Sequence, residues 1–200
     1  MNREQQISDH GKKEDELLIQ SFQADDVRAF DRLVIKYQDM VFNLCFRILG
    51  DYDDANDCSQ ETFIKVYKNL KGFRRQSSFT TWLYRITINT CRNRLASAKS
   101  RMRGKTVRID NPGGDDSGPL EIRDFSYSPD ALFEKNEQKR QIMRAIDSLE
   151  SDLRVLVVLR EFEGRSYEDI SDITGVNLGT VKSRLSRARH LLREMLSGVL

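Results

Sequence analysis

The stretch SYEDISDITGVNLGTVKSRLSRARHLLREML, residues 166–196, decides the fold prediction. Ser166 and Asp169 have the spacing of a capping box, in which each side chain bonds the other's backbone N–H, here with Asp in place of Glu. Gly175 supplies a sharp turn. The residues that follow carry an apolar stripe whose spacings alternate between four and three: Val181, Leu185, Ala188, Leu192 and Met195. The stretch therefore predicts a helix-turn-helix, two helices joined by a short turn that contains glycine.

The second of these helices has a cationic outer face. On a helical wheel at about 100° per residue, the arc opposite Val181 holds basic and hydroxyl side chains, and five basic but no acidic residues lie between Asn177 and Arg193. A helix exposed only to solvent would normally mix Glu with Lys four residues apart. The pattern instead favours a helix in the DNA major groove, with Arg184 and Arg189 at its flanks, nearer to phosphates. The predicted contact residues are Lys182, Ser183, Arg184, Ser186, Arg187 and His190.

Charged residues are segregated along the chain. The 33 Lys and Arg nearly balance the 31 Asp and Glu, so the net charge is only +2. Residues 62–109 nevertheless carry 13 basic and no acidic side chains, whereas residues 1–61 carry 14 acidic and 7 basic ones. Segregation of this kind indicates a polyanionic partner.

Proline occurs only between residues 110 and 130, as Pro112, Pro119 and Pro129. The same stretch is acidic and rich in glycine and serine, which predicts a flexible linker. We therefore expect an all-α protein of two small helical domains, 1–105 and 130–200, joined by a flexible acidic linker over 106–129. The second domain contains the helix-turn-helix. The expected helices run from a cap at Asp26 to Gly50, over 53–70, from 78 past 95, and over 130–147, 151–162, 166–174 and 178–196.

The basic segment FRRQSSFTTWLYRITINTCRNRL, residues 73–95, has the composition of a single-strand binding surface. Trp82, Arg85, Asn89 and Arg92 share the helix face opposite the apolar arc. Aromatic rings stack on bases, cations follow the phosphate backbone, and an amide can bond an exposed base edge. The alternatives are a boundary position for Trp82 and an ordinary surface amide at Asn89.

The preceding helix carries an acidic stripe, with Asp53, Asp57 and Glu61 one turn apart. Three carboxylates could in principle hold a divalent metal, but no histidine or further ligand cluster supports that interpretation. Favourable charge at a helix N-terminus explains part of the stripe, and a docking surface for a basic protein explains the rest. We expect no metal, no cofactor and no catalytic residue.

The remaining features indicate a cytoplasmic protein. Cys45, Cys58 and Cys91 lack the CxxC spacing of a metal or redox site and are expected to be buried thiols. No apolar run approaches the ~18 residues of a membrane span. The N-terminus lacks the apolar core of a signal peptide.

Four blocks, in order, resemble the bacterial extracytoplasmic-function (group 4, sigma-E-like) RNA polymerase sigma factors. They are AFDRLVIKYQDMVFNLCFRILGD (29–51), DANDCSQETFIKVYKNLKGFR (54–74), SSFTTWLYRITINTCRNRL (77–95) and RSYEDISDITGVNLGTVKSRLSRAR (165–189). The resemblance implies a promoter-specificity subunit without catalysis of its own. It also implies a region-2-like domain over 1–105 and a region-4-like domain over 130–200.

The family's partners and surfaces follow from the same resemblance. Core RNA polymerase, through the clamp helices of its largest subunit and the flap, is the expected protein partner, and family members commonly have an anti-sigma factor. The expected clamp contacts are Asp57, Gln60, Glu61 and Phe63. Promoter DNA is expected as duplex at the −35 element, on the helix from Asn177, and as non-template single strand at the −10 element. The expected −10 contacts are Phe73, Arg74, Trp82, Arg85, Asn89 and Arg92, with Asn89 matching a position that contacts a flipped base.

One departure and two rival interpretations remain. Some relatives have a bulky apolar residue where Ser186 stands, so the −35 sequence preference cannot be carried over. An autonomous helix-turn-helix regulator would bind duplex sites as a symmetric dimer, but no dimerisation helix is evident. A nuclease would need a carboxylate or histidine cluster beside the basic surface, and residues 62–109 contain none.

Overall fold

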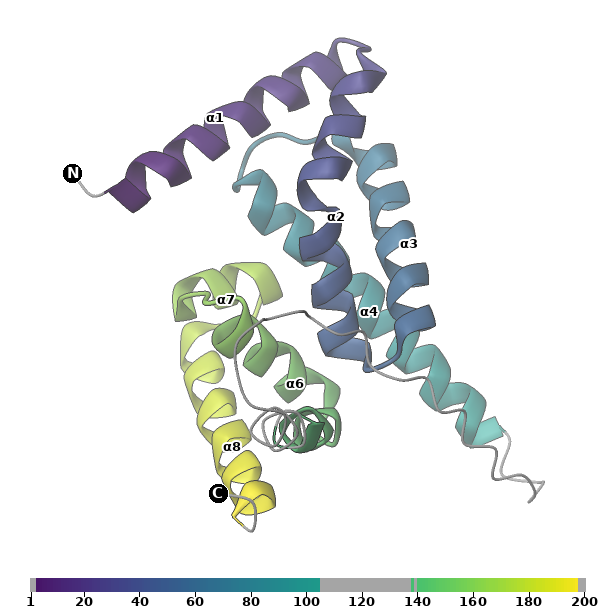
Figure 1. Ribbon diagram of the computed structural model, residues 1–200, viewed down its shortest axis with the longest axis vertical. Helices are drawn as coiled ribbons and strands as arrows, with labels where there is room; N and C mark the ends of the chain where they lie inside the picture. The colour runs from purple at the N-terminus through teal and green to yellow at the C-terminus, as the bar shows by residue number, and fades with distance from the viewer. Residues whose placement is uncertain (1–2, 105–137, 139, 198–200) are drawn as a thin grey trace, which may run out of the picture.

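The computed structural model describes residues 3–104, 138 and 140–197, with side chains for 11–97, 138 and 140–197. The described residues form helices and no strand, which confirms the all-α prediction (Figure 1). The predicted linker over 106–129 and the predicted helix start at Pro129 lie outside them. Residues 140–147 are helical. The other elements are α1 (Arg3–Gln23), α2 (Val27–Leu49), α3 (Tyr52–Leu70), α4 (Phe79–Gly104), α6 (Ser151–Val157), η1 (Val158–Phe162), α7 (Tyr167–Thr174) and α8 (Leu178–Leu196).

α2 begins and ends where the sequence predicted. The Asp26 carboxylate accepts a hydrogen bond of 3.1 Å from the backbone N–H of Arg28. At the other end Gly50 adopts the left-handed conformation with φ of 74°, which glycine occupies without the steric penalty of a Cβ. Asp51 then caps α3, so that helix starts at Tyr52, one residue before the predicted start.

The N-terminal domain is built around the apolar face of α4. Leu83, Tyr84 and Ile88 are each at most 1% exposed and join one core with buried side chains of α2 and α3. The free cysteines are all buried in this core, which confirms the prediction of buried thiols. A hydrogen bond to Cys45 raises the pKa of the Cys91 thiol, and burial adds to this effect. The Cys91 thiol is therefore protonated and unreactive.

α1 was not predicted from the sequence. Its C-terminal half buries Leu18, Ile19 and Phe22 against the domain core. Asp15 is 5% exposed and accepts hydrogen bonds from the ammonium of Lys36, at 2.6 Å, and from the hydroxyl of Tyr37. The spacings of three and four that mark these positions were present in the sequence, but only over two turns.

The helix-turn-helix has the predicted local structure. Ser166 Oγ accepts from the N–H of Asp169 at 3.0 Å, and the Asp169 carboxylate accepts from the N–H of Ser166 at 3.1 Å, which confirms the capping box. Gly175 ends α7 with φ of 70°, and Asn177 caps α8. Val181, Leu185 and the other apolar residues of the predicted stripe face the domain core, except Met195, which is 44% exposed.

The predicted helix over 151–162 differs in its second half. It is α-helical only to Val157 and continues as one π-helical turn, η1, closed by a hydrogen bond from the N–H of Glu163 to the carbonyl of Val158. A π-helical turn is wider than an α-turn. It brings Glu163 to the surface of the N-terminal domain.

The two domains pack against each other, which the sequence prediction of two tethered domains did not include (Figure 1). The Glu163 carboxylate accepts from the guanidinium of Arg47 at 2.6 Å and from the hydroxyl of Tyr84 at 2.7 Å. The guanidinium of Arg154 donates to the carbonyl of Ile48 at 2.8 Å. We call this packing of the second domain on α2 and α4 the closed arrangement.

Candidate nucleic-acid interface

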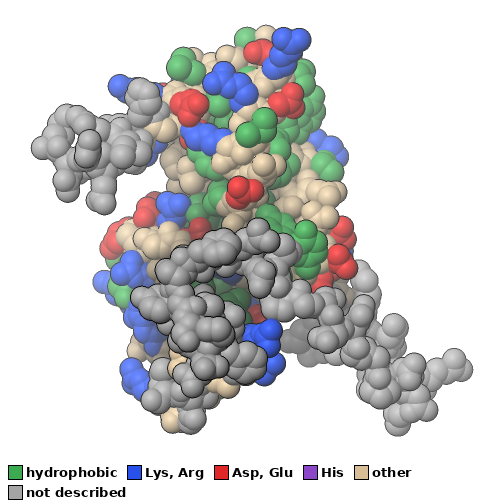
Figure 2. All heavy atoms as spheres, in the orientation of Figure 1, with side chains coloured by type: hydrophobic (Ala, Val, Ile, Leu, Met, Phe, Trp, Pro, Cys, Tyr) green, Lys and Arg blue, Asp and Glu red, His purple; other side chains and the backbone are tan. Residues whose placement is uncertain are grey.

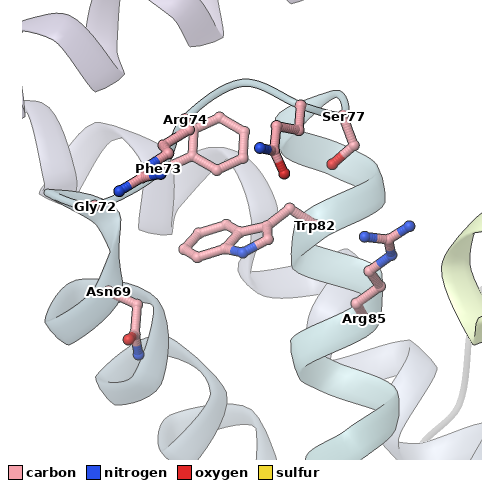
Figure 3. A pocket seen from close by; sticks show the side chains of 8 residues that line it. Asn69, Gly72, Phe73, Arg74, Ser77, Trp82 and Arg85 are labelled. Carbon is pink, nitrogen blue, oxygen red and sulfur yellow. The ribbon is translucent and has the colours of Figure 1, made fainter.

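A cleft of about 340 Å³ opens beneath the loop that joins α3 to α4. Its lining carries two arginines and no carboxylate, because all of it comes from the acid-free segment 62–109. Figure 3 shows the Trp82 ring projecting from α4 under this loop, with the Phe73 ring above it. We call it the aromatic cleft, and it is lined by Asn69, Gly72, Phe73, Arg74, Gln76, Ser77, Trp82 and Arg85.

The aromatic rings hold one another at the cleft wall. The centroids of Phe73 and Trp82 lie 4.9 Å apart with their planes tilted by 42°, and Phe79 lies 6.0 Å from Trp82 on the buried side. Trp82 is half-buried, so it is a boundary residue that belongs both to the core and to the cleft. Half-exposed, preorganised rings are the surfaces on which unpaired bases stack.

The predicted cationic face of α4 divides into two parts. Arg85 lies on the rim of the aromatic cleft, and its Nε donates to the carbonyl of Asp172 on α7 at 2.7 Å. Asn89 is exposed one turn further along α4, outside the cleft lining. Arg92 also lies outside the lining, half-buried beside Asp152 of the second domain at 3.3 Å. The structure therefore gathers Phe73, Arg74, Trp82 and Arg85 around one cavity and leaves Asn89 and Arg92 beyond it.

The outer face of α8 remains open in the closed arrangement. Figure 2 shows Lys and Arg side chains over the edge of the molecule that α8 forms. Arg184 is half-buried and lies 3.5 Å from Asp152, and Arg189 pairs with Glu161 at 2.8 Å. These two flanking arginines are thus held by carboxylates of their own domain. The predicted contact residues that are exposed are Lys182, Ser183, Ser186, Arg187 and His190.

The acidic stripe of α3 forms a continuous exposed face. Asp57, Gln60 and Glu61 are exposed, and Ile64 extends the same face with a 54% exposed side chain that sequence reasoning missed. The sequence did contain an indication of this position, because Ile64 follows Glu61 by three residues and therefore lies on the same helix face. Phe63 is half-buried and packs on the core instead.

The carboxylates of this face also have partners within the domain. Asp57 lies 3.2 Å from the guanidinium of Arg94, and Glu61 lies 2.7 Å from the ammonium of Lys65. Within the described ranges, no group of three or more His, Cys, Asp or Glu side chains could hold a metal ion. None of the described helices is long and apolar enough to cross a bilayer.

Comparisons with known proteins match both domains. The family model "Sigma-70 region 2" matches residues 33–101, and "Sigma-70, region 4" matches residues 139–192. The RNA polymerase sigma-H factor of Pseudomonas aeruginosa is 39% identical over 189 residues, which cover 94% of this chain and 97% of that protein. The ECF RNA polymerase sigma-E factor of Escherichia coli is 38% identical over 178 residues, covering 89% and 92%. The chain belongs to the extracytoplasmic-function sigma factors. It is an alternative sigma factor that directs promoter-specific transcription.

Solved structures agree on the fold of this sigma factor. The sigma factor RpoE of Bartonella quintana, solved with the anti-sigma factor NepR, has a TM-score of 0.63 at 24% identity and covers 87% of this chain and 100% of its own. CnrH, solved with the cytosolic domain of CnrY, has a TM-score of 0.64 at 22% identity and covers 94% and 99%. α1 precedes the region 2 match, and α8 lies within the region 4 match as far as residue 192.

Proposed function

We propose that this sigma factor acts in the cytoplasm, binds core RNA polymerase and recognises two promoter elements without a catalytic residue of its own. The observation that carries the proposal is the aromatic cleft, where two half-buried rings and two arginines converge without a carboxylate. Such a lining suits an unpaired base and its phosphate. The cleft would receive the non-template strand of the −10 element.

The −35 element would bind the exposed face of α8. Lys182 and Arg187 are exposed cations on a helix whose N-terminus is free to enter a major groove. Arg bound to guanine is the commonest specific contact of this kind. Ser183 and Ser186 supply short hydroxyl donors and acceptors beside them, and Arg184 would reach a phosphate once Asp152 releases it.

The acid-lined face of α3 would bind the clamp helices of the largest polymerase subunit. Ile64 adds an exposed apolar side chain to that face, and the polar side chains of Asp57, Gln60 and Glu61 lie on its N-terminal side. Apolar groups bordered by polar ones are typical of protein interfaces. The second domain would contact the flap.

The closed arrangement makes the two DNA surfaces unequal. The face of α8 is open, whereas Arg85 and Arg92 of α4 contact Asp172 and Asp152 of the second domain. Binding of a single strand along α4 would require those contacts to break. We infer that core polymerase separates the domains, and that an anti-sigma factor, if one binds, would act on the surfaces that this separation exposes.

In vitro transcription with core polymerase and a genomic fragment library would test this function, with start sites mapped by sequencing. Start sites that share −35 and −10 sequences are expected.

Arg74→Ala and Asn89→Ala should impair promoter opening more than initial binding, since extruding a base costs a few kcal/mol. A template with a mismatched, pre-melted −10 region should restore opening by both variants. Nanomolar, sequence-specific binding of the free protein to duplex DNA would instead favour an autonomous regulator.

A further inference from the structure

One side chain of α1 donates hydrogen bonds to the loop above the aromatic cleft, on the side away from the cleft. The amide nitrogen of Gln23 lies 3.2 Å from the carbonyl oxygen of Leu70, 3.4 Å from that of Lys71 and 3.2 Å from that of Phe73. A glutamine amide carries two N–H donors, which these three acceptors share. A single side chain thus joins the end of α3 to the first aromatic residue of the cleft.

The carbonyl of Leu70 also accepts from the N–H of Phe73, whereas Gln23 is the donor that the structure gives to the carbonyls of Lys71 and Phe73. The last carbonyls of a helix have no partner within the helix, and α3 ends at Leu70 without a glycine cap, since Lys71 at that position is right-handed. Gly72 and Phe73 then form two tight turns, donating to Asn69 and Leu70. Gln23 fixes the orientation of the Phe73 peptide and, through it, the ring that packs on Trp82.

Two further contacts hold the loop, one from the C-terminal end of α1 and one from the turn that follows it. Asp25 pairs with Lys71, and the amide oxygen of Gln20 lies 2.8 Å from the guanidinium of Arg75 in the orientation that satisfies both groups. Arg75 has φ of +53°, a left-handed conformation that a non-glycine residue keeps only where its surroundings impose it. The loop shape therefore depends on α1.

We infer that Gln23 is a positioning residue that sets the base preference of the aromatic cleft without touching DNA. The inference rests on the −10 role proposed for that cleft. Gln23 is half-buried behind the loop and is not part of the cleft lining, so its effect passes through the peptide of Phe73. α1 also precedes the residues matched by the region 2 family model, and no comparison assigns it a part in recognition.

Gln23→Glu is the informative variant, because it keeps the shape of the side chain and replaces both donors with acceptors. Gln23→Lys keeps N–H donors and serves as the rescue. Gln38→Glu makes the same chemical change at an exposed position of α2 and is the matched control. Each variant would be assembled with core polymerase, and its affinity measured by fluorescence anisotropy for single-stranded −10 oligonucleotides that differ by one base.

Gln23→Glu should reduce the affinity ratio between the preferred base and its competitors about tenfold, because the carbonyls of Leu70, Lys71 and Phe73 would face a carboxylate instead of an N–H donor. Affinity for core polymerase and for −35 duplex should stay unchanged, and Gln23→Lys and Gln38→Glu should keep the wild-type ratio. A lower melting temperature with an unchanged ratio would make Gln23 merely structural and overturn the inference. A wild-type holoenzyme without any base preference would overturn the proposed role of the cleft and the inference together.

Discussion

The carbonyl of Asp172 accepts a hydrogen bond of 2.7 Å from Nε of Arg85, so α7 of the second domain touches the rim of the aromatic cleft. The same arginine is one of the cations proposed to follow the −10 strand. A charged donor already bonded to protein must exchange that partner for phosphate. The strength of the closed arrangement therefore sets how readily the −10 surface becomes available.

Glu163 is the residue whose change should weaken the closed arrangement most directly. Its side chain is 10% exposed and accepts from both Arg47 and Tyr84. Glu163→Gln removes a charge-assisted pair at a partly buried site and should destabilise the domain contact by about 1–3 kcal/mol. Small-angle X-ray scattering should then show a larger radius of gyration for the free protein.

Glu168→Gln is the control for this change, because Glu168 is exposed on α7. It should leave the scattering curve as in the wild type. A Glu163→Gln protein as compact as the wild type would show that the other contacts between the domains maintain the closed arrangement without the Glu163 carboxylate.

Arg187→Ala should weaken use of the −35 element by about 1–3 kcal/mol if its guanidinium contacts a base edge. The side chain is exposed on the outer face of α8, so its loss should not disturb the fold. Arg144→Ala removes the same charge from an exposed site outside α8. Electrophoretic assays of holoenzyme on promoters with matched and altered −35 sequences would measure the difference, and equal effects of the two variants would remove Arg187 from base recognition.

Charge reversal of Asp57 and Glu61 together should lower affinity for core polymerase. Both carboxylates are exposed on the face that contains Ile64. A basic side chain in their place would be repelled by a polymerase surface that binds carboxylates. Circular dichroism should remain helical, because neither side chain is buried. Glu16→Lys on α1 is the control, because it reverses an exposed charge on another helix. An unchanged affinity of the double variant for core polymerase would show that the acidic stripe is only exposed to solvent and does not bind polymerase.

Tyr84 should make stability depend on pH at the alkaline end. Burial, and then the hydrogen bond to Glu163, raise the pKa of Tyr84 from 10.0 to about 12. The neutral phenol therefore stabilises the fold fully below pH 10, and this contribution is lost as the pH rises from 10 to about 12. Burial raises the pKa of Tyr37 to about 12 as well, so both tyrosines act in one window.

Chemical denaturation across that window would measure the decline in the free energy of unfolding. Tyr84→Phe should make the decline shallower, because one of the two titrating phenols is gone. A decline as steep as in the wild type would assign the whole effect to other groups.

The sequence predicted those parts of the fold that depend on neighbours along the chain. The cap at Asp26, the turn at Gly175 and the capping box of Ser166 and Asp169 are decided within about four residues, and all three were predicted correctly. The contacts of Glu163 and Gln23 join residues 47 or more positions apart. Nothing in local spacing specifies such pairs, so the closed arrangement and the support from α1 became visible only in three dimensions.

The candidate site shows the same division. The wheel correctly placed Trp82, Arg85, Asn89 and Arg92 on one side of α4. It could not show that the cleft is closed by a loop instead of a helix, and the loop reaches only Trp82 and Arg85. Phe73 and Arg74 came from the family resemblance, and the structure places both on that loop.

Gly50 ends α2 and also faces the second domain. A Cβ at this position would lie 3.1 Å from the carboxylate of Asp147, and φ of +74° independently disfavours any L-residue. Burial raises the pKa of Asp147, whose side chain is 38% exposed and lies 3.6 Å from the guanidinium of Arg154. Any substitution of Gly50 would therefore change both the C-terminal end of α2 and the packing of the second domain against it. Evolution cannot change one of these properties through position 50 without changing the other.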